Sequence, residues 1–264
     1  MKGKVALITG STSGIGLSIA RAFANAGFNL VIHGLEPDGA EIARSIEKEY
    51  SIETHYSSAD LLKPSEIEGM VSEAVSKFGP IDVLINNAGI QYVSAIEDFP
   101  LDKWNDIISV NLTASFCTSK AVWEGMKQKK WGRIINISSA HGLTASEFKS
   151  AYVASKHGLI GLTKVLALEG AEFGITANAI CPGFVKTPLV EKQIADLVNK
   201  HHISEEEVVQ NIILQKHAIK DFVSSDSIAA LALFLASDNA SMITGTSMPI
   251  DGGWLTFPGQ ARND

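Results

Sequence analysis

The sequence predicts a single α/β domain built on a doubly wound parallel β-sheet. Short apolar runs alternate along the chain with stretches that carry apolar residues at helical spacing. The apolar runs are nearly continuous, which is typical of parallel strands that helices cover on both faces. No repeat, low-complexity tract or linker interrupts the chain, so we expect one domain over residues 1–264.

The predicted elements follow one another in regular order. The first strand, 5–8, reads Val-Ala-Leu-Ile, and the helix 15–26 begins after a short glycine-rich turn. The later elements repeat the two patterns, a continuous apolar run and then apolar residues three or four positions apart. The later strands are 29–32, 81–85, 133–137 and 175–180, and the later helices are 65–77, 101–127, 152–173 and 227–236. Such a fold binds ligands at the carboxyl ends of its strands.

The stretch 186–225 departs from this alternation. It reads as two amphipathic helical pieces inserted between a strand and the last helix. An insertion beyond the carboxyl end of a strand lies where open α/β sheets bind ligands, so we interpret 186–225 as a helical substrate lid. Surface decoration is the alternative interpretation.

Charge and composition exclude several classes of protein. The net charge of −7 gives no support to nucleic-acid binding, which needs clustered Lys and Arg side chains. The apolar run before Gly10 is too short for a secretion signal, and no run approaches the ~18 apolar residues of a membrane helix. We expect a cytoplasmic protein without nucleic-acid or membrane partners.

The cysteines and histidines do not predict a metal site. Cys117 and Cys181 lie far apart and lack metal-ligand spacing, so we interpret both as buried thiols. His201 and His202 precede an acidic run at 205–207, a pattern that fits a solvated helix boundary better than a set of zinc ligands.

A glycine-rich loop follows the first predicted strand and reads Thr-Gly-Ser-Thr-Ser-Gly-Ile-Gly over residues 9–16. Gly10 permits a tight turn, Gly14 lets the backbone approach a pyrophosphate, and Gly16 lets the helix pack closely on the strand. The helix start then offers free N–H groups to the phosphates. The loop therefore predicts a Rossmann-type dinucleotide site, with a plain tight turn as the alternative.

Tyr152 and Lys156 are four residues apart on one predicted helix, which places them on the same face. A free tyrosine has a pKa of ~10, so it needs a neighbouring cation to lose its proton near neutral pH. Ser139, just after the strand 133–137, can hydrogen-bond a substrate oxygen. The trio predicts proton exchange with a hydroxyl group. The pair alone is also common in tyrosines that have no catalytic role.

Four motifs in this order resemble the short-chain dehydrogenase/reductase family across essentially the whole chain. They are the T-G-x-x-x-G-x-G loop at 9–16, the N-N-A-G run at 86–89, Ser139, and Tyr152 with Lys156. The resemblance implies that Tyr152 is the catalytic base or acid and that Asn111 keeps a water-linked proton path to Lys156. It implies cofactor contacts from Gly10, Thr12, Ser13, Gly14, Ile15, Gly16, Leu35, Asp60, Leu61, Asn87, Ala88, Gly89, Tyr152, Lys156, Pro182, Gly183, Val185 and Thr187.

We expect the cofactor to be NAD. The second strand runs into His-Gly-Leu-Glu at 33–36, where an Asp would hold the ribose 2′-hydroxyl and an Arg would receive a 2′-phosphate. Neither residue is present. Ser13 and Leu35 carry no positive charge, and the adjacent Glu36 disfavours a 2′-phosphate by electrostatic repulsion.

Several polar residues near the catalytic positions suit a small carboxylate substrate. Gln91 follows the N-N-A-G run, His141 follows Ser139, Lys149 precedes the catalytic helix, and Gln193 lies in the candidate lid. A desolvated carboxylate must be paired and hydrogen-bonded, which these side chains can do together. Taken singly, Lys149 could be a solvated surface charge and His141 a loop residue bonded to backbone.

The sequence around these residues is similar to one branch of the family, the bacterial D-3-hydroxybutyrate dehydrogenases. The similar segments are 86–91, 96–100, 139–143, 149–152, 156–158 and 187–193. The resemblance implies reversible oxidation of (R)-3-hydroxybutyrate to acetoacetate by a homotetramer. It implies substrate contacts from Gln91, His141, Lys149, Phe184, Gln193 and Trp254. Phe184 stands where this branch usually has Trp, which we expect to loosen the pocket while keeping an aromatic wall.

Two other functions stay open at this point. A reductase for 3-oxoacyl thioesters or sugars would share the fold, but it would not need both Lys149 and His141 against a free carboxylate. A catalytically idle nucleotide-binding protein would be expected to lose the serine, tyrosine or lysine, and this chain has kept Ser139, Tyr152 and Lys156.

Overall fold

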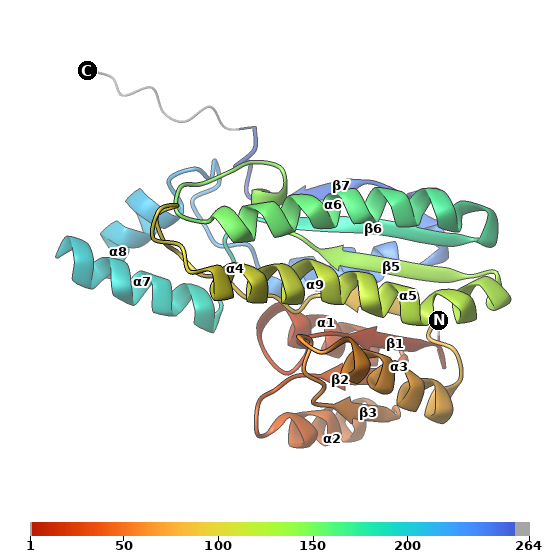
Figure 1. The fold of residues 1–264 in the computed structure, drawn as a ribbon. Coiled ribbons are helices and arrows are strands. Elements are labelled where there is room, and N and C mark those ends of the chain that lie inside the picture. Colours follow the sequence, from red (N-terminus) through yellow and green to blue (C-terminus); the bar gives the residue numbers. More distant parts are fainter. Residues whose placement is uncertain (1, 257–264) are drawn as a thin grey trace.

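Seven parallel strands form one sheet in the order β3-β2-β1-β4-β5-β6-β7 (Figure 1). The structure, a computed structural model, describes residues 2–256, apart from the side chains at 188, 189 and 192. The strands are β1 Val5–Ile8, β2 Asn29–His33, β3 Thr54–Ser57, β4 Val83–Asn86, β5 Gly132–Ile137, β6 Ile175–Pro182 and β7 Ser247–Ile250. The strand order turns back between β1 and β4, which is the switch point where such sheets bind ligands.

Helices cover both faces of the sheet. Buried apolar side chains of α1, α2 and α9 pack on one face, and those of α3, α5 and α6 pack on the other. The pair α7 and α8 has a separate small core beyond the strand ends (Figure 1). The helices are α1 Gly14–Asn25, α2 Gly39–Tyr50, α3 Pro64–Phe78, α4 Leu101–Ile108, α5 Ala114–Lys129, α6 Ser150–Gly170, α7 Pro188–His201, α8 Glu205–Val208 and α9 Ser225–Leu235.

The predicted fold class is confirmed. The structure differs from the prediction in elements that bury few side chains or lie at an edge of the sheet. The sequence did not locate β3, α2 or β7. The strand β3 is mostly polar and β7 contains Pro249, and the two lie at opposite edges of the sheet, where such residues are tolerated. The helix α2 buries few residues. Apolar patterning weakens in elements that face solvent, so these three carry the weakest signal.

The single helix expected over 101–127 is instead two helices, α4 and α5, joined by a π-helical turn at Ser109–Thr113. A π-turn adds one residue to the helix and is frequent at functional sites. Asn111 lies in this turn and is buried.

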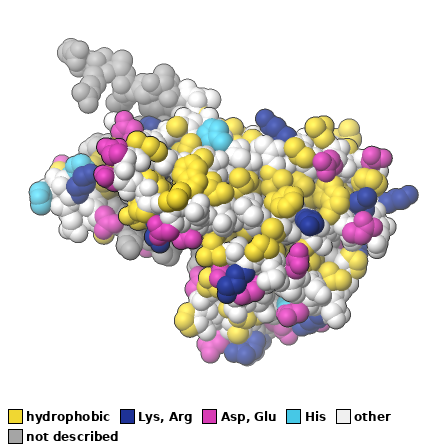
Figure 2. Space-filling model, viewed as in Figure 1, with side chains coloured by type: hydrophobic (Ala, Val, Ile, Leu, Met, Phe, Trp, Pro, Cys, Tyr) yellow, Lys and Arg dark blue, Asp and Glu magenta, His cyan; other side chains and the backbone are white. Residues whose placement is uncertain are grey.

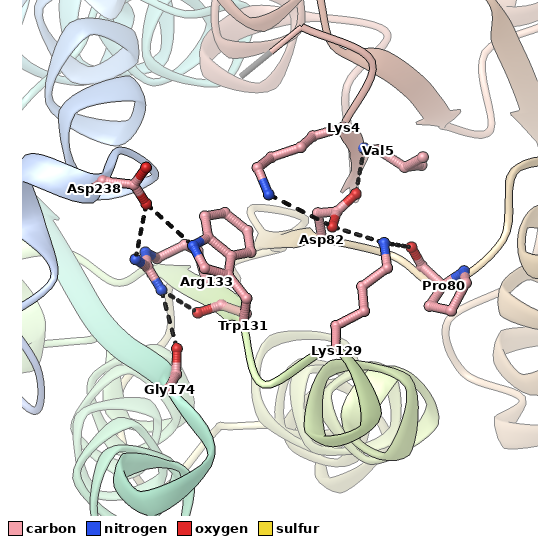
Figure 3. Close-up of polar contacts among 10 residues, drawn as sticks. Lys4, Val5, Pro80, Asp82, Lys129, Trp131, Arg133, Gly174 and Asp238 are labelled. Carbon is pink, nitrogen blue, oxygen red and sulfur yellow. Dashed lines mark hydrogen bonds and ion pairs between the residues drawn. The ribbon is translucent and has the colours of Figure 1, made fainter.

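A charged cluster lies at the amino ends of β1, β4 and β5 (Figure 3). The predicted site lies at the other end of the strands. Asp82 is buried and accepts hydrogen bonds from the Val5 backbone N–H at 2.9 Å and from Lys129 Nζ at 2.7 Å. The Arg133 guanidinium lies 4.3 Å from the centroid of the Trp131 ring. The Asp82 contacts tie the starts of β1 and β4 to the end of α5, so we assign the cluster a structural role.

We expect Asp82→Ala to lower the free energy of unfolding by about 2 kcal/mol, because the Val5 N–H loses its acceptor and Lys129 its counter-ion. Urea denaturation measures this loss. Asp106→Ala is the matched control, because its carboxylate pairs with Lys103 at 3.8 Å on the surface and is worth about 0.5 kcal/mol or less. Equal losses in the two variants would contradict the structural role of Asp82.

Candidate active site

One cavity beyond the carboxyl ends of the strands is lined by Ser139, Tyr152 and all six predicted substrate residues. Its volume is about 140 Å³. The loop after β4, the start of α6, the helix α7 and the chain after β7 each contribute to it. The six are Gln91, His141, Lys149, Phe184, Gln193 and Trp254. Side chains that are far apart in the sequence therefore face one small space.

Tyr152 and Lys156 lie one turn apart on α6. The Lys156 ammonium is 5.6 Å from the centroid of the Tyr152 ring and donates a hydrogen bond to the Ile137 carbonyl at 2.8 Å. Burial lowers the pKa of Lys156 to about 8. Burial raises the pKa of Tyr152, and a hydrogen bond with Ser139 opposes that rise. Tyr152 thus holds its proton at neutral pH and needs added positive charge nearby to act as a base.

Asn111 joins the π-turn to the loop after β4. Its Oδ1 accepts a hydrogen bond from the Ile90 backbone N–H at 2.8 Å, and its Nδ2 donates to the Ile90 carbonyl at 3.0 Å. Nδ2 also donates to Ser155 Oγ at 3.1 Å. These contacts fix the loop that carries Gln91. The expected water-linked path from Asn111 to Lys156 stays a prediction.

Lys149 lines the cavity and is only 8% exposed. Burial, together with the nearby charge of Lys216, lowers the pKa of Lys149 to about 8. Among the residues that the structure describes, no carboxylate forms an ion pair with Lys149. A buried ammonium without a counter-ion is unfavourable, so the cavity is suited to receive an anion.

His141 lies beside this ammonium as a neutral imidazole. Burial, and then the charge of Lys149, lower the pKa of His141 to about 3. Its Nε2 is 2.9 Å from Ser146 Oγ, and its backbone N–H donates to Ser139 Oγ at 3.1 Å. A neutral imidazole can hydrogen-bond a carboxylate without adding charge to the site.

Aromatic rings close one wall of the cavity. Phe184 and Trp254 stack with centroids 5.3 Å apart and planes 3° from parallel. His217 is wholly buried behind them, and its Nε2 accepts a hydrogen bond from the Phe184 backbone N–H at 3.3 Å. The Lys216 ammonium is 5.7 Å from the Trp254 ring centroid. Lys216 and His217 were not predicted, because only the fold brings them to the site and no motif marks them.

The glycine-rich loop has the shape that a pyrophosphate needs. Gly10 has a φ of +63°, and a Cβ at Gly16 would overlap the Gly10 carbonyl oxygen. The helix α1 begins without a side-chain cap, so its first N–H groups remain able to bind an anion. Asn87 Nδ2 donates to the carbonyls of Thr9 and Gly10 at 2.9 Å each and fixes the loop against the end of β4. These residues therefore fit a dinucleotide.

Glu36 faces the same loop from the end of β2. Its carboxylate accepts hydrogen bonds from the hydroxyls of Thr12 and Ser13. Burial opposes ionisation of Glu36, but these hydrogen bonds, together with those from the backbone of residues 35 and 36, outweigh it and hold its pKa below the ordinary value. The carboxylate is thus ionised beside the predicted phosphate loop.

The remaining predicted cofactor residues lie at or just after the ends of β2, β3, β4 and β6, apart from Ile15 near the start of α1. Leu35 is exposed, whereas the side chain of Leu61 is buried in the core, so only the backbone of Leu61 is available to a ligand. Asp60 Oδ1 accepts a hydrogen bond from the Leu62 N–H at 3.0 Å. Ile15, Pro182, Gly183, Val185 and Thr187 line the cavity itself.

Within the described part of the chain, no three His, Cys, Asp or Glu side chains gather as metal ligands would. Over the same residues, no helix combines the length and the apolar character needed to span a membrane.

Comparison with known proteins agrees with this geometry. A profile of the short chain dehydrogenase family matches residues 4–197. The chain is 52% identical to a D-beta-hydroxybutyrate dehydrogenase of Rhizobium meliloti, over 95% of this chain and 98% of that protein. It is 50% identical to a protein of the same name from Cupriavidus necator, over 97% and 99% of the two chains. An acetoacetyl-CoA reductase of Paracoccus denitrificans is 36% identical over 96% and 99%.

Proposed function

Because the chain belongs to the short-chain dehydrogenase family, it is an oxidoreductase, and we propose that it oxidises (R)-3-hydroxybutyrate reversibly to acetoacetate with NAD. The buried, unpaired ammonium of Lys149 carries the choice of substrate, because it shares a cavity of about 140 Å³ with Tyr152. A small acid with a hydroxyl near its carboxylate satisfies both groups at once. Two relatives that are 52% and 50% identical to this chain are named D-beta-hydroxybutyrate dehydrogenase.

Tyr152 is the general base in the proposed oxidation. It takes the proton of the C3 hydroxyl, and Ser139 donates a hydrogen bond to the same oxygen. Lys156 favours the phenolate of Tyr152 through its charge. NAD, when bound, supplies the hydride acceptor and a further positive charge. In the reverse direction, Tyr152 returns the proton to the ketone oxygen.

The substrate carboxylate is held at the other end of the cavity. Lys149 provides the charge, and Gln91, His141 and Gln193 provide hydrogen bonds. Gln193 comes from α7, which packs with α8 in its own small core. This separate core supports the proposal that 186–225 moves as a lid over the substrate.

The proposal includes a homotetramer in the cytoplasm. Apolar side chains gather over α5 and α6 in Figure 2, and Phe116, Val165 and Leu168 on these helices are 51%, 49% and 80% exposed. Such a surface is typical of an interface between subunits. Cys117 and Cys181 are free thiols, which a reducing compartment preserves.

NAD is proposed over NADP on the position of Glu36. Its ionised carboxylate beside Thr12 and Ser13 would repel a 2′-phosphate and can accept hydrogen bonds from ribose hydroxyls. We expect Glu36→Gln to reduce the NAD/NADP ratio of kcat/KM by about tenfold, which corresponds to about 1.4 kcal/mol. The control is Glu41→Gln, an exposed residue on α2. An unchanged ratio in Glu36→Gln would refute the role of this carboxylate.

The alternatives gain no specific support. Thioester and sugar substrates leave the Lys149 ammonium without a counter-ion, and the small cavity has little room for a bulky group. An idle nucleotide-binding protein has no need of Tyr152, Lys156 and Ser139 together.

The decisive experiment follows NADH absorbance with the purified protein. Substrates are (R)- and (S)-3-hydroxybutyrate, lactate and 3-hydroxyvalerate, each with NAD and with NADP. We expect the (R)-3-hydroxybutyrate and NAD pair to give the highest kcat/KM. A higher value for lactate or for the (S) isomer would overturn the substrate proposal, and a higher value with NADP would overturn the cofactor proposal.

A further inference from the structure

His33, the last residue of β2, joins three segments of the chain beneath the glycine-rich loop. It is 3% exposed. Its Nδ1 is 3.0 Å from the Gly10 backbone nitrogen, and its Nε2 is 2.9 Å from the Ala59 carbonyl oxygen. The imidazole thus links the β1–α1 loop to the loop after β3, which carries Asp60 and Leu61.

These two partners determine the protonation of His33. The Gly10 N–H can only donate, so Nδ1 must accept and cannot carry a proton. The Ala59 carbonyl can only accept, so Nε2 must donate and carries the proton. Only the neutral tautomer with hydrogen on Nε2 satisfies both contacts. A second proton on Nδ1 would place two N–H groups against each other and break the contact with Gly10.

The backbone of His33 holds the loop as well. The His33 N–H donates to Ser11 Oγ at 3.0 Å, and the Ser11 N–H donates to the His33 carbonyl at 2.7 Å. Ser11 Oγ donates in turn to the Ile8 carbonyl at 2.8 Å. Gly10 therefore has its left-handed conformation fixed from both sides, and its N–H depends on the imidazole for an acceptor.

We propose that His33 is a positioning residue for the dinucleotide-binding loop, and that only its neutral form holds the loop in the binding conformation. The inference rests on the proposed function in one respect, that the loop at 9–16 binds NAD(H). It does not depend on the substrate.

The surroundings of His33 favour the neutral form. Burial lowers the pKa of His33 below its ordinary value, against the opposing effects of the Ala59 hydrogen bond and the charge of Glu36. Gly10 and Ser11 from the β1–α1 loop and Ala59 from the loop after β3 carry no charge, so Glu36 is the ionised group that acts on it. Because the folded pKa is lowered, the loop contact is intact at neutral pH and is lost as the pH falls through that lowered value.

Two variants of the full chain test this role by direct binding. His33→Leu removes the acceptor, whereas His33→Asn keeps a carbonyl that can accept from Gly10 and does not titrate. NADH affinity is measured by fluorescence titration from pH 8 down to the lowest pH at which circular dichroism shows each protein folded. At pH 8 we expect His33→Leu to raise the Kd for NADH about tenfold or more, and His33→Asn to stay within about threefold of the wild type.

The pH dependence distinguishes positioning from simple packing. As the pH falls through the lowered pKa of His33, we expect the NADH Kd of the wild type to rise more steeply than that of His33→Asn. The inference is overturned if folded His33→Leu binds NADH like the wild type, or if His33→Asn loses affinity with acid as steeply as the wild type. Should His33→Leu fail to fold, the comparison of wild type with His33→Asn decides alone. A wild type that does not bind NADH at any pH would instead refute the proposed cofactor and, with it, this inference.

Discussion

Replacing Lys149 with methionine is expected to raise KM for (R)-3-hydroxybutyrate by about 10²–10³-fold with a much smaller change in kcat. The ammonium is buried, has no counter-ion in the described structure and lies on the cavity that contains Tyr152. Truncating one partner of a buried, hydrogen-bonded charge pair costs about 2–5 kcal/mol, and a 10²–10³-fold loss of affinity lies within that range. Methionine keeps the volume of the side chain, so the loss measures charge rather than a cavity. Steady-state kinetics at saturating NAD gives both constants.

The pH dependence of KM tests the same role independently. The pKa of Lys149 is lowered to about 8 by burial. A bound carboxylate favours the charged form, so substrate affinity is greatest below about pH 8 and is lost as the pH rises through that value. In Lys149→Met, KM should be high at every pH, and its rise above pH 8 should disappear.

A matched variant distinguishes the effect of the buried Lys149 charge from that of any positive charge near the cavity. Lys216 lies close enough to Lys149 to lower its pKa, but it is exposed. Lys216→Met should therefore raise KM only a few-fold, because the charge of an exposed side chain is screened by water. An equal loss in both variants, or an unchanged KM in Lys149→Met, would refute the assignment of Lys149 to the carboxylate.

The sequence predicted the residues that line the cavity, but it did not predict the residues that pack behind them. Gln91, His141, Lys149 and Gln193 lie in motifs or beside them, and parallel strands bring such positions to one edge of the sheet. His217 has no such marker. It reaches the Phe184 backbone only because the chain after α8 folds back against the segment that follows β6, a contact that local patterning does not encode.

The difference between local pattern and tertiary contact also explains why the sequence did not locate β3 and β7 and why it predicted one helix over 101–127 instead of two. Strands β1, β4 and β5 are buried on both faces, and each gives a strong apolar run. The edge strands β3 and β7 are less buried and can include polar residues or proline, so their apolar runs are weak. The π-turn at Ser109–Thr113 is associated with tertiary contacts of Asn111 with Ile90 and Ser155. Helical periodicity does not encode these contacts, so it predicted one continuous helix through α4 and α5.

Phe184 was expected to keep an aromatic wall in place of tryptophan. In the structure it stacks on Trp254 in a nearly parallel arrangement, 5.3 Å between centroids. Its backbone N–H is held by His217. The aromatic wall is therefore present, and the effect of the smaller ring on the tightness of the pocket stays a prediction.

Tyr152→Phe is expected to lower kcat by about 10³-fold or more while leaving the Kd for NADH within about twofold. General acid–base catalysis contributes about 10²–10⁴-fold, and Tyr152 lines the cavity with its ring centroid 5.6 Å from the Lys156 ammonium. The variant removes one oxygen and keeps the ring, so the edge-to-face contact with His141 is preserved. Rapid-mixing measurement of the hydride-transfer step ensures that chemistry, not product release, is compared.

The control for this variant is Tyr50→Phe, at the end of α2 and remote from the cavity. It should have the kcat of the wild type. Burial raises the pKa of Tyr152, so the oxidation should gain rate as the pH rises, because the base form becomes more populated. The residual activity of Tyr152→Phe should lack that pH dependence. If Tyr152→Phe retains more than about a tenth of the wild-type rate, or keeps the same pH profile, then another group removes the hydroxyl proton and the proposed mechanism is wrong.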